Sequence, residues 1–193
     1  MCSSDLGSAS NPGLVALSLL DQWSTFRQYV TDWRRMSVYY AAITSEGRGR
    51  VTSVPRMADP IVTYRLTHRD RELLRSGLAR LTLLMLEAGA TDVFPSFKGA
   101  PRVRSRKDLA SMQQAFSASK ATVMTVHLCS TVPMGEVVDR CGADSYGRVH
   151  GMKNVHVNDA SLLPTAPGVN PQASVMAFAI RNARRFAAGE SNG

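Results

Sequence analysis

Apolar residues recur at steps of three and four in three stretches of the chain, a pattern that predicts amphipathic helices. Thr67 and Asp70 precede the second stretch with the spacing of a capping box, and Gly89 follows it as a terminator. We therefore expect one long helix between them. The apolar faces comprise Leu19, Trp23, Phe26, Val30 and Trp33 in the first stretch, Leu74, Leu78, Leu81 and Met85 in the second, and Leu109, Met112 and Phe116 in the third.

Strand-forming residues are concentrated in three short segments, Met36–Ile43, Arg50–Val54 and Ile61–Leu66. The turn residues Glu46 to Gly49 lie between the first and second segments, so we expect these two to form a hairpin. A loop rich in proline and glycine follows, from Thr91 to Arg104. Its two phenylalanines, Phe94 and Phe97, either line a pocket or anchor the loop by burial.

The last apolar pattern begins at a turn-to-helix junction. Asn170 is a favoured N-cap residue, and Pro171 then falls at the first helical position, where its missing N–H costs nothing. A helix N-terminus carries a partial positive charge and free N–H groups, which suit an anion. On spacing alone, an ordinary capped helix is the favoured explanation of the junction. Its apolar face comprises Val175, Met176, Ala179, Ile180 and Ala183.

The composition is that of a globular protein: 193 residues, 44% of them hydrophobic, with a net charge of +8. The basic residues are scattered and lack interleaved aromatic residues, so we expect solvated surface and no nucleic-acid partner. A basic binding module is the alternative. No signal peptide or membrane-length apolar run is visible, and a cytoplasmic location is expected. The densest basic cluster is Arg102, Arg104, Arg106 and Lys107.

The cysteines and histidines do not form a recognisable metal motif. Cys129 and Cys141 lie near His127 and His150 in the sequence, but their spacing fits no usual zinc pattern, so no metal site is predicted. Three cysteines, with Cys2 as the third, do not suggest a disulfide framework. His150 and His156 are interpreted as structural.

Four segments, in a fixed order, resemble the C-terminal part of the glucose–methanol–choline (GMC) family of flavin oxidoreductases. One departure stands out: Ser130 occupies a position where the family motif has glycine. Within the family, the motif sequences are most similar to those of long-chain-alcohol-oxidase-like and bacterial members. The matching segments are HLCSTVPMG from His127 to Gly135, Gly147 to Gly151, Val157 to Ser161, and Pro164 to Gln172.

The resemblance implies a mixed α+β and α/β fold in two parts. Residues 1–121 would form part of a substrate-binding domain, an antiparallel sheet backed by helices. Residues 122–193 would form the C-terminal portion of a Rossmann-like FAD-binding domain with the catalytic motif. The family's G-x-G-x-x-G fingerprint, which cradles the pyrophosphate, does not occur in the chain. We therefore expect a C-terminal fragment, and the opening MCSSDLGSAS resembles a translated sequencing adapter.

The resemblance also implies an activity, the FAD-dependent oxidation of an alcohol to an aldehyde or ketone. His127 matches the position of the base that takes the hydroxyl proton while hydride leaves for flavin N5, a role that suits histidine. Asn170 matches a second catalytic position, where an amide can hold the substrate oxygen but cannot act as a base. The expected partners are a small-molecule alcohol and either oxygen or a quinone as electron acceptor. The isolated fragment is expected to be inactive.

Further matching positions concern the cofactor. Asp159 and Ala160 correspond to positions at the flavin's phosphate and ribityl region. Asn170, Pro171 and Gln172 begin the helix that would point at the isoalloxazine ring. The positive end of that helix would stabilise negative charge on the reduced flavin.

Overall fold

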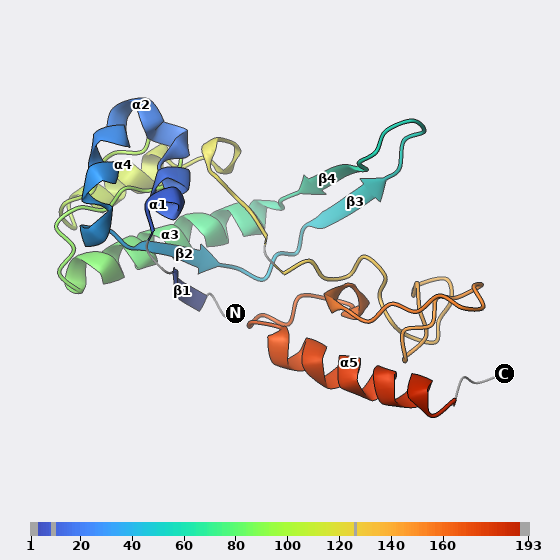
Figure 1. Ribbon diagram of the computed structural model, residues 1–193. Coiled ribbons are helices and arrows are strands. Elements are labelled where there is room, and N and C mark those ends of the chain that lie inside the picture. Colours follow the sequence, from blue (N-terminus) through green and yellow to red (C-terminus); the bar gives the residue numbers. More distant parts are fainter. Residues whose placement is uncertain (1–3, 9–10, 126, 190–193) are drawn as a thin grey trace. The chain divides into compact units, whose positions relative to one another are not determined.

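The computed structural model describes residues 4–8, 11–125 and 127–189, arranged as two compact units, Met1–Val123 and Met124–Gly193 (Figure 1). Cys2, which entered the sequence argument, lies outside the described residues. The assignment of residues 1–121 and 122–193 to a substrate-binding and a flavin-binding domain stays a prediction.

The described chain contains helices and short antiparallel strands, which confirms the predicted mixed fold class. The first unit contains β1 (Ser4–Ser8), α1 (Pro12–Ser18), η1 (Leu20–Gln22), α2 (Trp23–Phe26), η2 (Arg27–Arg35), β2 (Val38–Ala42), β3 (Arg48–Thr52), β4 (Ile61–Arg65), α3 (His68–Glu87), α4 (Asp108–Ala115) and η3 (Ala118–Lys120), where η denotes a 3-10 helix. The second unit contains η4 (Ala160–Leu162) and α5 (Gln172–Ala187).

The strands pair in two separate two-stranded sheets (Figure 1). β1 pairs with β2, with Leu6 opposite Tyr40, and β3 pairs with β4, with Val51 opposite Val62. The predicted hairpin between Met36–Ile43 and Arg50–Val54 is therefore wrong, although all three predicted strands exist. The turn between β2 and β3 leaves the first sheet because the start of α3 holds its backbone.

Asp70 makes that connection. Its carboxylate is fully buried and accepts hydrogen bonds from the backbone N–H groups of Glu46 (2.9 Å), Gly47 (3.0 Å) and Thr67 (2.8 Å). The Asp70 N–H donates in turn to the Thr67 hydroxyl, which completes the predicted capping box. Burial raises the pKa of Asp70, but the hydrogen bonds from Thr67 and Glu46 outweigh it and lower the pKa. A local helix cap thus also fixes the path of the chain into β3.

The predicted N-terminal helix is broken into four short pieces between α1 and η2. Asn11 caps α1 by accepting a hydrogen bond from the Leu14 N–H at 2.8 Å. The predicted apolar face is largely confirmed, because Leu19 and Phe26 are buried and Val30 and Trp33 pack against them. Trp23 is an exception, at 41% exposed.

The loop from Thr91 to Arg104 supplies most of the main core. Val93 and Val103 exchange two backbone hydrogen bonds of 2.9 Å, which close the loop on itself. Phe97 is fully buried between α3 and α4, beside Met112, and stacks edge-on against Phe116. The interpretation of Phe97 as a buried anchor is confirmed.

A charge network joins the same loop to η2. Arg102 donates to Asp92 at 2.6 Å and to the Tyr29 hydroxyl at 2.7 Å, and Arg104 donates to Asp92 at 3.0 Å. The guanidinium of Arg102 also lies 4.9 Å from the centre of the Tyr29 ring. The hydrogen bond from Arg102, followed by that from Arg104, lowers the pKa of Asp92 from 3.8 to about 2.

Replacing Asp92 with asparagine is expected to remove one part of the protein's acid sensitivity. The folded protein holds this carboxylate ionised to lower pH than the unfolded chain does. Its contribution is therefore complete above its ordinary pKa and is lost as the pH falls from 3.8 toward about 2. Urea unfolding midpoints of the full-length protein between pH 5 and 2 should fall less steeply in Asp92→Asn. Asp32→Asn, at an exposed position of η2, is the matched control, and equal slopes in all three proteins would contradict the prediction.

Candidate functional site

The candidate site lies at the N-terminal end of α5. The first helical hydrogen bond runs from the Val175 N–H to the Pro171 carbonyl at 2.9 Å, so the helix begins at Gln172. Asn170 is therefore not the N-cap, and the prediction that Pro171 occupies the first helical position is wrong by one residue. No side chain caps the helix, so the N–H groups of its first turn stay open to a ligand.

Phe178 sets the orientation of α5 within its unit. It is buried against Leu162 and Ala143, and Val175 packs at the margin of the same cluster. The predicted apolar face is only partly the buried one, because Met176 and Ile180 are 56% and 50% exposed. The helical period was predicted correctly, but the buried stripe is rotated toward Phe178.

Polar contacts hold the second half of the helix. Arg185 and Arg181 lie over the Tyr146 ring, at 3.9 Å and 4.8 Å from its centre. The buried Asn182 donates to Asn158 at 3.3 Å. These contacts attach the second half of α5 to the segment around Gly147. They therefore also constrain the direction of the helix and the place of its N-terminal turn.

The segment that begins at His127 is attached to the loop before α5. Val132 N–H donates to the Ser161 carbonyl at 3.2 Å, and Met134 N–H donates to the Leu162 carbonyl at 2.9 Å. The buried Leu162 therefore lies where the two segments meet. The stretch from Asn154 to Asn158, whose composition also favours a strand, does not form one. Two hydrogen bonds, from Val149 to Val155 and from Val157 to Gly147, hold that stretch around one isolated bridge.

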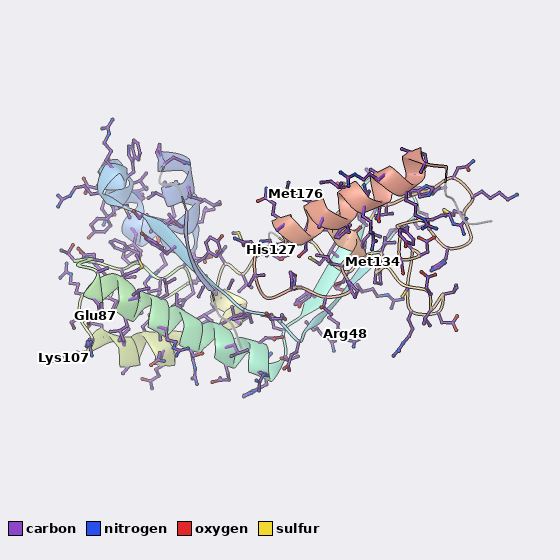
Figure 2. All side chains as sticks on the ribbon, turned by 90° about the horizontal axis from the view of Figure 1, so that it is seen from below. Arg48, Glu87, Lys107, His127, Met134 and Met176 are labelled. Carbon is purple, nitrogen blue, oxygen red and sulfur yellow. The ribbon has the colours of Figure 1, made fainter. Side chains whose placement is uncertain are left out.

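An open pocket of about 480 Å³ brings the two predicted catalytic residues together. His127 is half-buried there, whereas Asn170 is exposed. Figure 2 shows His127 and Met176 together at the N-terminal end of α5. Val175 and Met176 were assigned only to the apolar face of the helix, although they follow Pro171 and Gln172 by four residues each, which places them on the same side. The pocket is lined by His127, Asn170, Pro171, Gln172, Val175 and Met176.

Asp159 and Ala160, the other predicted cofactor residues, do not line this pocket. Asp159 caps η4 by accepting a hydrogen bond from the Ser161 N–H at 2.8 Å. Hydrogen bonds from the Ser161 hydroxyl and N–H lower the pKa of Asp159. The carboxylate is thus ionised and oriented by its own turn, and it remains exposed.

The remaining histidines and cysteines have other surroundings. A ring nitrogen of His150 lies 2.9 Å from the Gly135 carbonyl, and His156 stacks edge-on against Phe186. Burial raises the pKa of the Cys129 thiol. Within residues 4–8, 11–125 and 127–189, no group of three or more His, Cys, Asp or Glu side chains is arranged to hold a metal ion.

The chain is similar to known proteins over most of its length. Residues 44–179 match the family model described as GMC oxidoreductase. The chain is 39% identical over 91% of its length to the uncharacterized GMC-type oxidoreductase y4nJ of Sinorhizobium fredii, and covers 35% of that protein. It is 29% identical over 93% of its length to the long-chain-alcohol oxidase FAO1 of Arabidopsis thaliana, and covers 25% of that protein.

The fold is similar to that of a solved oxidase. The crystal structure of pyridoxine 4-oxidase from Mesorbium loti matches 78% of this chain with a TM-score of 0.52 and 23% identity, over 29% of that protein. The chain thus spans about a third or less of the length of the relatives that it matches. This chain therefore belongs to the GMC oxidoreductase family and corresponds to a C-terminal part of its members.

Proposed function

We propose that the full-length protein to which this chain belongs is an FAD-dependent oxidoreductase that converts an alcohol to an aldehyde or ketone. The single observation that carries the proposal is the pocket in which His127 and Asn170 meet at an uncapped helix N-terminus. The two residues lie far apart in the sequence, so the fold has to bring them together. Oxidation of CH–OH donors is consistent with the alcohol oxidase among the relatives.

His127 would take the proton of the substrate hydroxyl. A neutral imidazole can accept a proton, and the half-buried His127 lines the pocket. The pocket is lined by no carboxylate, so a competing base is absent from its lining residues.

Asn170 would hold the substrate oxygen. Its amide is an uncharged donor and cannot itself remove the proton. It is free for this role because it does not cap α5. A donor placed where negative charge develops on the oxygen stabilises the transition state more than the ground state.

The chain's groups fit a flavin at this place. GMC oxidoreductases are in general flavoproteins, and FAD when bound supplies an acceptor for the hydride. Pro171 and Gln172 would hold it at the start of α5, where the uncapped N–H groups and the helix dipole favour a partly negative ring. Asp159 and Ala160 would contact its phosphate and ribityl portion from η4. Oxygen or a quinone would then accept the electrons.

The basic binding module receives no support from the structure. Three arginines of the densest basic cluster are engaged in ion pairs, Arg102 and Arg104 with Asp92, and Arg106 with Glu87 at 2.8 Å. Figure 2 labels Glu87 and Lys107 near the end of α3. No described helix is long and apolar enough to cross a membrane. The isolated chain exposes many large apolar side chains, so we propose that it is inactive without the rest of the protein.

The proposal predicts that the purified full-length protein shows a flavin absorbance spectrum that bleaches when an alcohol is added without oxygen. A panel from ethanol to long-chain primary alcohols would establish the substrate range. Addition of oxygen or a soluble quinone to the bleached protein should restore the spectrum and identify the acceptor. A full-length protein that binds no flavin, or flavin that no alcohol bleaches, would refute the proposal.

A further inference from the structure

Ser130 has an unusual backbone conformation beside the candidate site. Its φ is +70°, in the left-handed region that residues other than glycine rarely adopt. Among the described residues, Arg56 is the other non-glycine residue with a positive φ. Such a conformation persists only where the surrounding structure compensates for its cost.

The Ser130 side chain provides a compensating contact. Its hydroxyl donates to the Pro164 carbonyl at 2.9 Å, across 34 residues of sequence. Alanine in the same conformation would bear the same backbone cost without this contact. The left-handed turn therefore directs the hydroxyl to a different segment of the chain.

That contact is the last of a series that leads toward the pocket. The bonds from Met134 to Leu162 and from Val132 to Ser161 start at the buried core, and the Ser130–Pro164 bond comes next. Beyond it, one segment runs three residues back to His127, and the other runs six residues forward to Asn170. A loss of this bond would free both segments at the point where they approach the pocket.

We propose that Ser130 is a positioning residue: its hydroxyl, held in the left-handed turn, joins the His127 segment to the Pro164–Asn170 segment and so sets the spacing of the two site residues. The catalytic part of this inference rests on the proposed function. Ser130 itself does not line the pocket and acts through His127 and Asn170.

Three substitutions in the full-length protein separate positioning from stability. Ser130→Gly relieves the backbone cost but removes the hydroxyl, whereas Ser130→Thr keeps the hydroxyl but adds a β-branched side chain at positive φ. Ser130→Ala has neither advantage. If Ser130 positions the site, kcat depends on the hydroxyl: it should be about tenfold lower in Ser130→Gly and Ser130→Ala and close to wild type in Ser130→Thr, with KM little changed. The midpoint temperature of thermal unfolding should depend on the backbone cost instead, and should be lower in Ser130→Thr and Ser130→Ala than in Ser130→Gly.

A second measurement does not depend on turnover. Diethyl pyrocarbonate modifies exposed imidazoles, and peptide mass spectrometry reports the rate at His127, with His156 as internal reference. We expect His127 to be modified faster in Ser130→Gly and Ser130→Ala than in the wild type, and at the wild-type rate in Ser130→Thr. A Gly variant with wild-type kcat and wild-type His127 modification, or a kcat that follows the thermal midpoint across the series, would overturn the proposal. If the wild type oxidises no alcohol, the proposed function fails, while the modification rates still decide the role of Ser130.

Discussion

Replacement of His127 by alanine in the full-length protein should lower kcat for alcohol oxidation by about 10²–10⁴-fold, the range typical for loss of a general base. The flavin spectrum should remain, because the groups that we assign to cofactor binding lie at the starts of η4 and α5 and do not include His127. The measurement is the rate of flavin bleaching in single-turnover experiments, which isolates the chemical step from release of product.

His156→Ala is the matched control for this experiment. His156 is an exposed histidine of the same unit, outside the pocket and stacked on Phe186, so its loss should leave the bleaching rate unchanged. If His127→Ala bleaches at the wild-type rate, the assignment of His127 as the base is refuted. An equal loss in both variants would indicate a structural effect and would contradict the assignment as well.

Replacement of Asp70 by alanine should destabilise the first unit by about 3 kcal/mol, because it removes a buried, charged acceptor from three part-buried backbone N–H groups. The effect should be local as well as global. Hydrogen exchange of the Glu46 and Gly47 amides should lose protection first, since their bonds to Asp70 fix the turn into β3. Urea unfolding of the full-length protein gives the magnitude.

The same carboxylate predicts a pH dependence with a definite sign. The pKa of Asp70 is lowered in the folded protein, so its contribution is present above its ordinary value of 3.8 and is lost as the pH falls below it. Asp70→Asn should be less stable than wild type at pH 7 and should approach it at low pH. Asp59→Ala, which removes a charge at an exposed position, is the control. Unchanged exchange at Gly47 in Asp70→Ala would contradict the structural role.

Features that depend on neighbours in sequence were predictable. The capping box of Thr67 and Asp70, the long helix behind it and the burial of Met112 all follow from short spacings. The strand segments were also identified, because their composition is local. Their partners were not, since the carboxylate of Asp70 diverts the chain after β2 and leaves β2 to pair with β1.

The site residues likewise include some that the sequence predicted and some that it did not. The motif resemblance named His127 and Asn170, and the structure places both at one pocket. Asp159 and Ala160 lie apart from that pocket, and their roles toward the flavin stay predictions. Val175 and Met176 were missed as pocket residues because an apolar residue at helical spacing has the same pattern whether it faces a core or a ligand.

By itself, the sequence determined the family, the helical periods and the residue types that the chemistry needs, because these depend on residue order and on contacts a few positions apart. Tertiary structure alone decided which strands pair, which stripe of α5 is buried against Phe178, and that His127 meets the uncapped end of α5. It also decided the left-handed turn at Ser130, whose hydroxyl finds its partner 34 residues away. The physical reason is that each of these features balances a local cost against a contact between distant segments, and residue order alone does not reveal such a contact.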